Sequence, residues 1–142
     1  MSRYLLDTNV ISNLVRPVPS PSLVDWMAGR ADGELFISAL TLAEIERGIR
    51  QLPDGRKKIK LEAWFAGPEG PAALFAGRVV AFDAAAAAIW ARLMADGKRA
   101  GRPRSALDMI VAACAEAMDA VIVTDNARDF EGLDILNPIR PA

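Results

Sequence analysis

Short apolar runs alternate with longer amphipathic segments along this chain, and this alternation limits the possible folds more than any other feature. The runs expected to form strands lie at 4–6, 35–38, 78–82 and 120–124, with a last edge strand at 133–136. Helical spacing of apolar residues is found at 10–15, 22–27, 41–52, 55–65, 83–100 and 105–118. Short buried strands separated by helices are typical of a parallel sheet covered on both faces. The pattern therefore predicts an α/β fold, and residues 1–142 show no linker or repeat that would divide them into several domains.

Two of the expected strands are followed directly by acidic residues. Asp7 ends the first apolar run, and Asp125 comes after the β-branched run that ends at Thr124. The carboxyl ends of parallel strands meet at one edge of a sheet, and ligands bind at that edge in open α/β folds. We therefore expect both acids at a functional edge. Each also has a plain structural interpretation, Asp7 as a helix cap and Asp125 as a turn residue.

Further acids lie beside the apolar stripes of two expected helices. Glu44 follows Thr41 by three residues, and Asp108 follows Ser105 by the same interval, which is the spacing of a capping box. Both acids also border the apolar face of their helix, so their side chains are placed to face a cleft. Asp129 lies in a polar stretch and has the ordinary interpretation of a turn residue.

The composition removes several classes of chemistry. The chain contains no histidine, so imidazole bases, Ser-His-Asp triads and histidine-ligated zinc are all excluded. Cys114 is the only cysteine, which excludes an internal disulfide and fits a reducing compartment. A net charge of −1 gives no general attraction to nucleic acid. No segment has the length and apolarity of a membrane span, and no secretory signal is evident, so we expect a cytoplasmic protein with no membrane partner.

Clustered carboxylates repel one another, and burying them without a counterion costs several kcal/mol. Oxygen-only ligand sets select hard cations such as Mg²⁺ or Mn²⁺. Two such ions about 4 Å apart are able to activate water and stabilise the leaving oxygen in phosphodiester hydrolysis. The acids of this chain therefore favour a metal-dependent hydrolase that needs no histidine.

Four motifs together resemble the PIN domain. They are Asp7-Thr8-Asn9, Glu44 on a helix, Asp108 on a late helix, and the T-D-N-A-R-D-F stretch at 124–130. More narrowly, the chain resembles the VapC toxins of bacterial VapBC toxin–antitoxin pairs over essentially its whole length. The resemblance implies a single PIN-like α/β/α sandwich with a central parallel sheet. It also implies an Mg²⁺-dependent endoribonuclease, with Mn²⁺ as a substitute, that belongs to a type II toxin–antitoxin pair.

The same resemblance implies roles for individual residues. Metal ligands are expected at Asp7, Glu44 and Asp108, with Asp7 and Asp108 as the main direct ligands. The catalytic set adds Asn126 and Asp129. Contacts with the RNA substrate are expected from Thr8, Asn9, Arg102, Arg104 and Thr124. Many relatives carry an acid where this chain has Asn126, so the fourth acidic position is left open among Asp125, Asn126 and Asp129, as is the number of metal ions.

Two further interactions are expected. The basic stretch at 98–104 is a candidate docking site for RNA, although a solvated loop is its plain interpretation; its cations are Lys98, Arg99, Arg102 and Arg104. The resemblance implies a cognate VapB-type antitoxin that inhibits by occupying the cleft. A surplus of large apolar residues on the first four helices suits an amphipathic partner helix, with an arginine reaching the acids. A homodimer is a rival or additional use of that surface.

Two other functions compete with the ribonuclease interpretation. A haloacid-dehalogenase-like phosphotransferase also uses an aspartate after its first strand. That family needs a second aspartate two residues later, where this chain has Asn9. The other alternative is a catalytically silent PIN-like interaction module, against which the intact acids argue.

Overall fold

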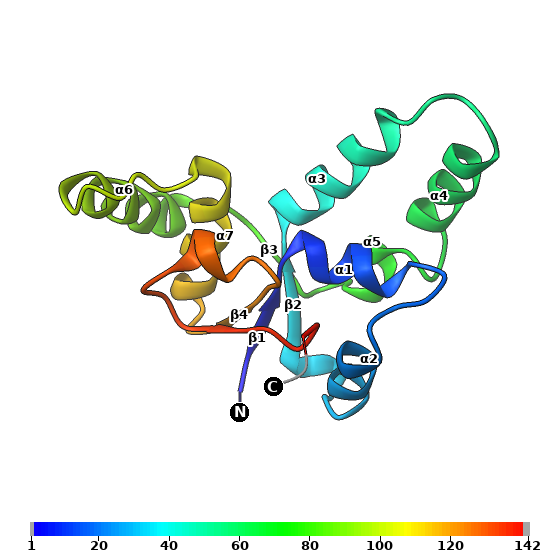
Figure 1. Cartoon of the computed structure of the whole chain (residues 1–142), viewed down its shortest axis with the longest axis horizontal. Coiled ribbons are helices and arrows are strands. Elements are labelled where there is room, and N and C mark those ends of the chain that lie inside the picture. The colour runs from blue at the N-terminus through cyan, green and yellow to red at the C-terminus, as the bar shows by residue number, and fades with distance from the viewer. Residues whose placement is uncertain (1, 141–142) are drawn as a thin grey trace.

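The computed structural model describes residues 2–140, in which five parallel strands form one sheet between two layers of helices (Figure 1). The strands are β1 (Tyr4–Leu6), β2 (Leu35–Ser38), β3 (Val79–Val80), β4 (Val121–Val123) and β5 (Ile135–Leu136). The helices are α1 (Thr8–Leu14), α2 (Pro21–Ala28), α3 (Ala39–Arg50), α4 (Arg56–Ala66), α5 (Pro71–Leu74), α6 (Ala84–Arg99) and α7 (Ala106–Ala117). Two 3₁₀ turns, η1 (Asp32–Glu34) and η2 (Ala127–Phe130), complete the elements. The expected α/β/α architecture is confirmed.

The strand order is β3-β2-β1-β4-β5, and every neighbouring pair is parallel. The first strand is therefore central, with Tyr4 in register with Leu35 of β2 on one side and Val121 of β4 on the other. This order brings the carboxyl ends of β1, β2 and β4 together at one edge. The residues that follow these three strands are consequently the candidates for a shared site.

The two faces of the sheet carry separate apolar cores because side chains alternate along a strand. Leu5 and Ile122 face a core that is built mainly from α6 and α7. Their chain neighbours Leu6 and Val123 face the other core, which α1, α2 and α3 cover. The central strands β1 and β4 are thus buried on both sides, which explains why their sequences read as continuous apolar runs.

A hydroxyl or carboxylate cap marks the start of α1, α2, α3, α6 and α7. Ser38 accepts the backbone N–H of Thr41, so α3 starts at residue 39 and not at 41 as expected. Helix α5 lies outside the expected helical segments, and Pro71 occupies its first turn, where a missing N–H is tolerated. The basic stretch is also partly helical, since Lys98 and Arg99 form the last turn of α6.

The helices diverge above the sheet edge in Figure 1, with α6 and α7 on one side and α3 and α4 on the other. Loops and helix starts that follow β1, β2 and β4 lie between these two arms. Within residues 2–140, no helix has the length and apolarity needed to cross a membrane.

Candidate functional site

Asp7 lies at the carboxyl end of β1 and is only 5% exposed. Its carboxylate accepts the backbone N–H of Thr8 at 2.8 Å, the hydroxyl of Thr124 at 2.9 Å and the amide of Asn9 at 3.3 Å. Burial raises the pKa of Asp7, the hydrogen bonds from Thr8 and Thr124 oppose this shift, and the nearby charge of Glu44 adds to it. Asp7 is the N-cap of α1 and also the buried acid at this sheet edge, so it fits both the capping interpretation and the expected place at the edge.

Glu44 approaches from α3, directly across from the start of α1. Its Oε1 accepts the hydroxyl of Thr8 at 2.9 Å, and its Oε2 lies 3.8 Å from the guanidinium of Arg47. The capping role considered for Glu44 is wrong, because α3 is capped by Ser38 and Thr41 already lies inside the helix. Glu44 is therefore free to face Asp7, as its influence on the pKa of that residue indicates.

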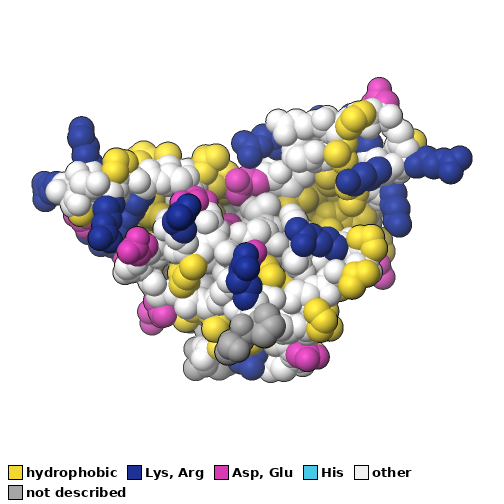
Figure 2. Space-filling view, viewed as in Figure 1, with side chains coloured by type: hydrophobic (Ala, Val, Ile, Leu, Met, Phe, Trp, Pro, Cys, Tyr) yellow, Lys and Arg dark blue, Asp and Glu magenta, His cyan; other side chains and the backbone are white. Residues whose placement is uncertain are grey.

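Asp108 enters from α7, on the other side of the notch, which is the hollow between the arm of α3 and α4 and the arm of α6 and α7 (Figure 2). Ser105 caps this helix and accepts the backbone N–H of Asp108 at 3.2 Å, as its spacing predicted. Burial and the charge of Asp7 raise the pKa of Asp108 to about 6, with smaller contributions from Asp129 and Glu44. Four acids from separate parts of the sequence thus share one electrostatic environment, which is the convergence expected at this edge.

The candidates for the fourth acidic position differ in their partners. Asp125 points to the C-terminal segment, where it accepts Asn137 at 3.0 Å and Arg140 at 2.8 Å, and these contacts lower its pKa. Asn126 donates its amide to Asp129 at 2.8 Å, and Asp129 in turn raises the pKa of Asp108. Asp129, held by Asn126, is therefore the acid of this stretch that faces the others.

Thr124 and Asn9 connect the two central strands beneath the acids. Thr124 is fully buried, and besides donating to Asp7 its hydroxyl accepts the Asn9 amide at 3.1 Å and the Asn126 N–H at 3.0 Å. Asn9 completes the connection by accepting the backbone N–H of Asp125 at 3.0 Å. Thr124 was expected to contact substrate, but its burial leaves it no access. It positions Asp7 instead.

The donor set has the chemistry of a hard-cation site, because it offers carboxylate oxygens and no nitrogen or sulfur ligand. Among residues 2–140, however, no three acidic or cysteine side chains are already grouped closely enough to hold one ion. Mg²⁺ commonly uses only one or two carboxylates and keeps several waters. The raised pKa values of Asp7 and Asp108 fit a site that binds such a cation. The ligand assignment of Asp7, Glu44 and Asp108 stays a prediction.

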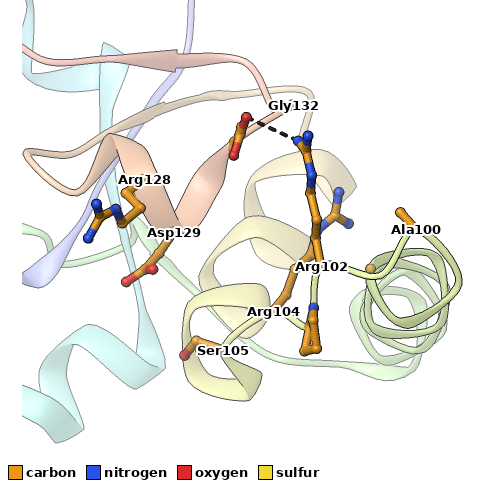
Figure 3. Close-up of a pocket in the computed structure, with 10 residues that line it drawn as sticks. Ala100, Arg102, Arg104, Ser105, Arg128, Asp129 and Gly132 are labelled. Atoms are coloured by element: carbon orange, nitrogen blue, oxygen red, sulfur yellow. Dashed lines mark hydrogen bonds and ion pairs between the residues drawn. The ribbon is translucent and has the colours of Figure 1, made fainter.

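The expected RNA-binding arginines are already engaged within the protein. Arg104 donates to the carbonyl of Leu93 at 3.0 Å, and Arg102 lies 3.1 Å from Glu131 in an exposed ion pair. Both line a cavity of about 450 Å³ between the end of α6, the α6–α7 loop and η2 (Figure 3). Asp129 lines the same cavity, so the cavity opens beside the acids.

An apolar groove of about 360 Å³ begins at the acids on the opposite side of the notch. Thr8 and Glu44, which are hydrogen-bonded to each other at the acidic site, are among its lining residues, and its walls come from α1, α3 and α4. The apolar side chains that line it are Ile11, Val15, Pro17, Ile45, Ile49, Leu52, Leu61 and Trp64. Figure 2 shows an apolar patch beneath α3 and α4, and acidic side chains gathered in the notch beside it. Part of the expected surplus of large apolar residues is thus accessible.

Sequence reasoning missed several residues that support the site. Ser38 and Thr41 are fully buried, and the hydroxyl of Ser38 donates to Thr41, which lies 3.4 Å from the hydroxyl of Thr8. Ser38 ends β2, so its place at the same sheet edge was a usable signal. Asn137 and Arg140, which hold Asp125, gave no local signal because a turn and a short strand separate them from their partner.

A buried aspartate at the edge of a parallel sheet, with acids converging from α3, α7 and η2, defines a carboxylate-based site on an α/β/α sandwich. The sequence profile of the PIN domain matches residues 4–136. The chain belongs to the PIN-domain family.

Relatives of similar length support this membership. The chain is 36% identical to the VapC ribonuclease Y4jK of Sinorhizobium fredii over 140 residues, which is 97% of this chain and 99% of the relative. It is 35% identical to toxin FitB of Neisseria gonorrhoeae over 131 residues, covering 92% and 93% of the two chains. The crystal structure of FitAcB from Neisseria gonorrhoeae superposes with a TM-score of 0.88 at 34% identity, covering 95% of this chain and 97% of that chain. The expected resemblance to VapC-type toxins is confirmed.

Proposed function

We propose that this protein is an Mg²⁺-dependent endoribonuclease that acts as the toxin of a type II toxin–antitoxin pair, with Mn²⁺ as a possible substitute. The observation that carries the proposal is the shared environment of Asp7, Glu44, Asp108 and Asp129 at one sheet edge, which raises the pKa of Asp108 to about 6. A relative of nearly equal length bears the name VapC ribonuclease, which supports the same activity.

Each residue has a definable task in this proposal. Asp7 and Asp108 hold the cation, and Glu44 contributes charge while it keeps the hydroxyl of Thr8 oriented. A bound Mg²⁺ supplies an activated water and neutralises charge on the phosphodiester. Asn126 holds the carboxylate of Asp129 toward Asp108. Thr124 and Asn9 keep Asp7 in one orientation by donating to its Oδ2.

The alternative functions are weaker on structural grounds. A haloacid-dehalogenase-like phosphotransferase needs a carboxylate where this chain has Asn9, and the amide of Asn9 is committed to Asp7 and Thr124. A silent interaction module has no need for a buried aspartate that is supported by three donors. Such a costly arrangement favours an active site.

The apolar groove supports a protein partner that regulates the site. We expect a VapB-type antitoxin to lay the apolar face of a helix into the groove formed by α1, α3 and α4. The groove ends at Thr8 and Glu44, so a basic side chain at the end of that helix reaches the acids. Arginine suits this position because its guanidinium pairs with carboxylates in a fixed geometry. A homodimer through another surface is compatible with this arrangement.

The decisive experiment measures cleavage of single-stranded RNA by the purified protein with Mg²⁺, with Mn²⁺ and with a chelator. Cleavage is expected only with a divalent cation, and hydrolysis of a phosphomonoester is not expected. Phosphomonoester hydrolysis without RNA cleavage would indicate the phosphotransferase class. RNA that remains intact under all conditions, with a folded protein, would indicate the silent module.

A further inference from the structure

The cavity between α6 and η2 adjoins the acidic site but is electrostatically different from it. Three arginines line it, Arg102, Arg104 and Arg128, against two acids, Asp129 and Glu131. Its volume of about 450 Å³ is typical of ligand pockets, which span about 300–1,000 Å³. No aromatic side chain lines it, so a base has no ring to stack on there. Recognition in this cavity would therefore rest on charge and hydrogen bonding.

One wall of the cavity is built to hold its arginines in place. Gly97 of α6 is buried, and a Cβ at this position would lie 2.9 Å from the carbonyl oxygen of Arg102 and 3.0 Å from the side chain of Arg104. The missing side chain lets the α6–α7 loop lie directly on the helix, where the N–H of Arg102 donates to the Gly97 carbonyl at 2.9 Å. Arg104 is anchored to Leu93.

The Arg102–Glu131 ion pair spans the cavity from this loop to the segment after η2 (Figure 3). The Arg102 side chain is 74% exposed and that of Glu131 is 68% exposed. An ion pair in such an exposed position is worth about 0–1 kcal/mol, so it contributes little to folding. Glu131 is also easily replaced in this pair, because a phosphate group, like a carboxylate, is able to accept two hydrogen bonds from a guanidinium.

We propose that the cavity is an RNA subsite in which a phosphate next to the cleaved one replaces Glu131 as the partner of Arg102. In the free protein Glu131 neutralises Arg102 and screens the cavity from other anions. This assignment rests on the proposed ribonuclease function, because the strand reaches the cavity from the acidic site through Asp129, which borders both. Glu131 thus competes with an RNA phosphate for Arg102 and lowers the affinity of the cavity for RNA.

The proposal is tested by RNA binding in an Asp108→Asn background, which prevents cleavage. A fluorescent single-stranded RNA is titrated with the full-length protein at several salt concentrations. Glu131→Gln is expected to tighten binding about threefold to tenfold at low salt. Because the contact between Arg102 and phosphate forms in both proteins, the slope of log K against log salt should stay the same. Adding Arg102→Gln removes this contact, so it should abolish the tightening and make the slope shallower by about 0.7.

The matched control is Glu116→Gln, which makes the same charge change and breaks a comparable exposed pair with Arg92, between α6 and α7 and away from the cavity. Equal effects of Glu131→Gln and Glu116→Gln would overturn the subsite, as would a gain that persists without Arg102. If the background protein binds RNA but neither Glu131→Gln nor Arg102→Gln changes the affinity, the subsite fails while the proposed function stands. If the parent protein cleaves no RNA with Mg²⁺, the proposed function fails and the subsite fails with it. Thermal unfolding of each variant verifies that the fold is retained.

Discussion

The hydroxyl of Thr124 donates a 2.9 Å hydrogen bond to Oδ2 of Asp7, and the two residues are separated by 117 positions in the sequence. They meet because β1 and β4 are parallel neighbours, with Leu6 in register with Val123. The bond therefore forms only when the sheet is assembled. Since Asp7 is buried and ionised carboxylates are costly to bury, this donor stabilises both the fold and the charge of the site.

The first prediction concerns this hydrogen bond. Thr124→Val keeps the shape of the side chain but removes one of the three donors to Asp7 and leaves the N–H of Asn126 without its acceptor. We expect a loss of about 1–3 kcal/mol in the free energy of unfolding. RNA cleavage should fall by about 10- to 100-fold, as for residues that orient a metal ligand. Thr124→Ser retains the hydroxyl and should keep most of the stability and most of the RNA cleavage. Equal losses in the two variants would contradict the role of the hydroxyl in positioning Asp7.

The second prediction concerns the acids themselves. Asp7→Asn and Asp108→Asn should each reduce RNA cleavage by more than about 100-fold, which exceeds the loss for residues that merely orient ligands. Circular dichroism should remain native, because an amide fills the same space. Asp25→Asn, on the exposed surface of α2, is the control with the same charge change. A folded Asp108→Asn variant that retains cleavage would remove Asp108 from the site.

The third prediction concerns pH. The folded protein holds the proton of Asp108 up to about pH 6, whereas the unfolded chain releases it near 3.8. The folded state binds more protons in this window, so the contribution of Asp108 to stability is lost as the pH rises from about 4 to about 6. Asp108→Asn mimics the protonated form, so the free energy of unfolding of this variant should depend less on pH between about 4 and 6.

The measurement is urea unfolding of both proteins in a chelating buffer across this pH range. Asp108→Asn should gain stability relative to the parent at neutral pH and little at about pH 4. Mg²⁺ should stabilise the parent more at neutral pH than at low pH, because only the ionised carboxylate binds it. Parallel pH curves for the two proteins would contradict the raised pKa.

The fourth prediction compares two helical glycines. A Cβ at Gly97 would meet the carbonyl oxygen of Arg102 at 2.9 Å, whereas nothing lies within 4 Å of a Cβ at Gly48 in α3. Gly97→Ala should therefore destabilise the protein by about 1–3 kcal/mol through overpacking. Gly48→Ala should stabilise it by about 0.5–1 kcal/mol, the usual gain in a helix interior. Urea unfolding measures the change in the free energy of unfolding of each variant. Similar effects at both positions would show that the α6–α7 loop does not pack on α6 as described.

The sequence predicted the features that depend on local pattern and on parallel topology. Alternating strands and helices gave the sheet, and the sheet brought Asp7 and Thr124 to one edge. Ser105 capped α7 as its spacing indicated. The same reasoning failed for Thr41 and Glu44, because Ser38, at the end of β2, is a closer and better placed cap. Where two hydroxyls compete for one helix end, spacing alone does not decide between them.

The features that sequence could not supply depend on long-range side-chain pairing. Asp125 looked like an active-site acid, but Arg140 and Asn137 draw it toward the C-terminal segment. Arg102 looked like a free cation, but Glu131 partly neutralises it across the cavity. These partners lie 12 to 29 residues apart, in segments without periodic pattern, so nothing local reports which charges meet.

The last prediction tests the groove as the binding site of the antitoxin. Val15 lines the groove and is 40% exposed, whereas Val24 on α2 is 43% exposed and lies outside it. A carboxylate at Val15 would have to lose its hydration when an apolar helix face covers the groove, which costs several kcal/mol if no partner is supplied. Val15→Glu should therefore weaken binding of the VapB-type antitoxin strongly, whereas Val24→Glu should leave it unchanged.

Cleavage of RNA by each free variant separates binding from folding. Neither valine touches the acids, so both variants should cleave RNA at nearly the parental rate when the antitoxin is absent. With the antitoxin present, Val15→Glu should escape inhibition, and rising Mg²⁺ should relieve inhibition of the parent, because the cation and the partner's arginine compete for the same carboxylates. Equal inhibition of both variants would place the antitoxin on another surface. Inhibition that is insensitive to Mg²⁺ would instead retain the groove and reject the arginine contact with Asp7 and Asp108.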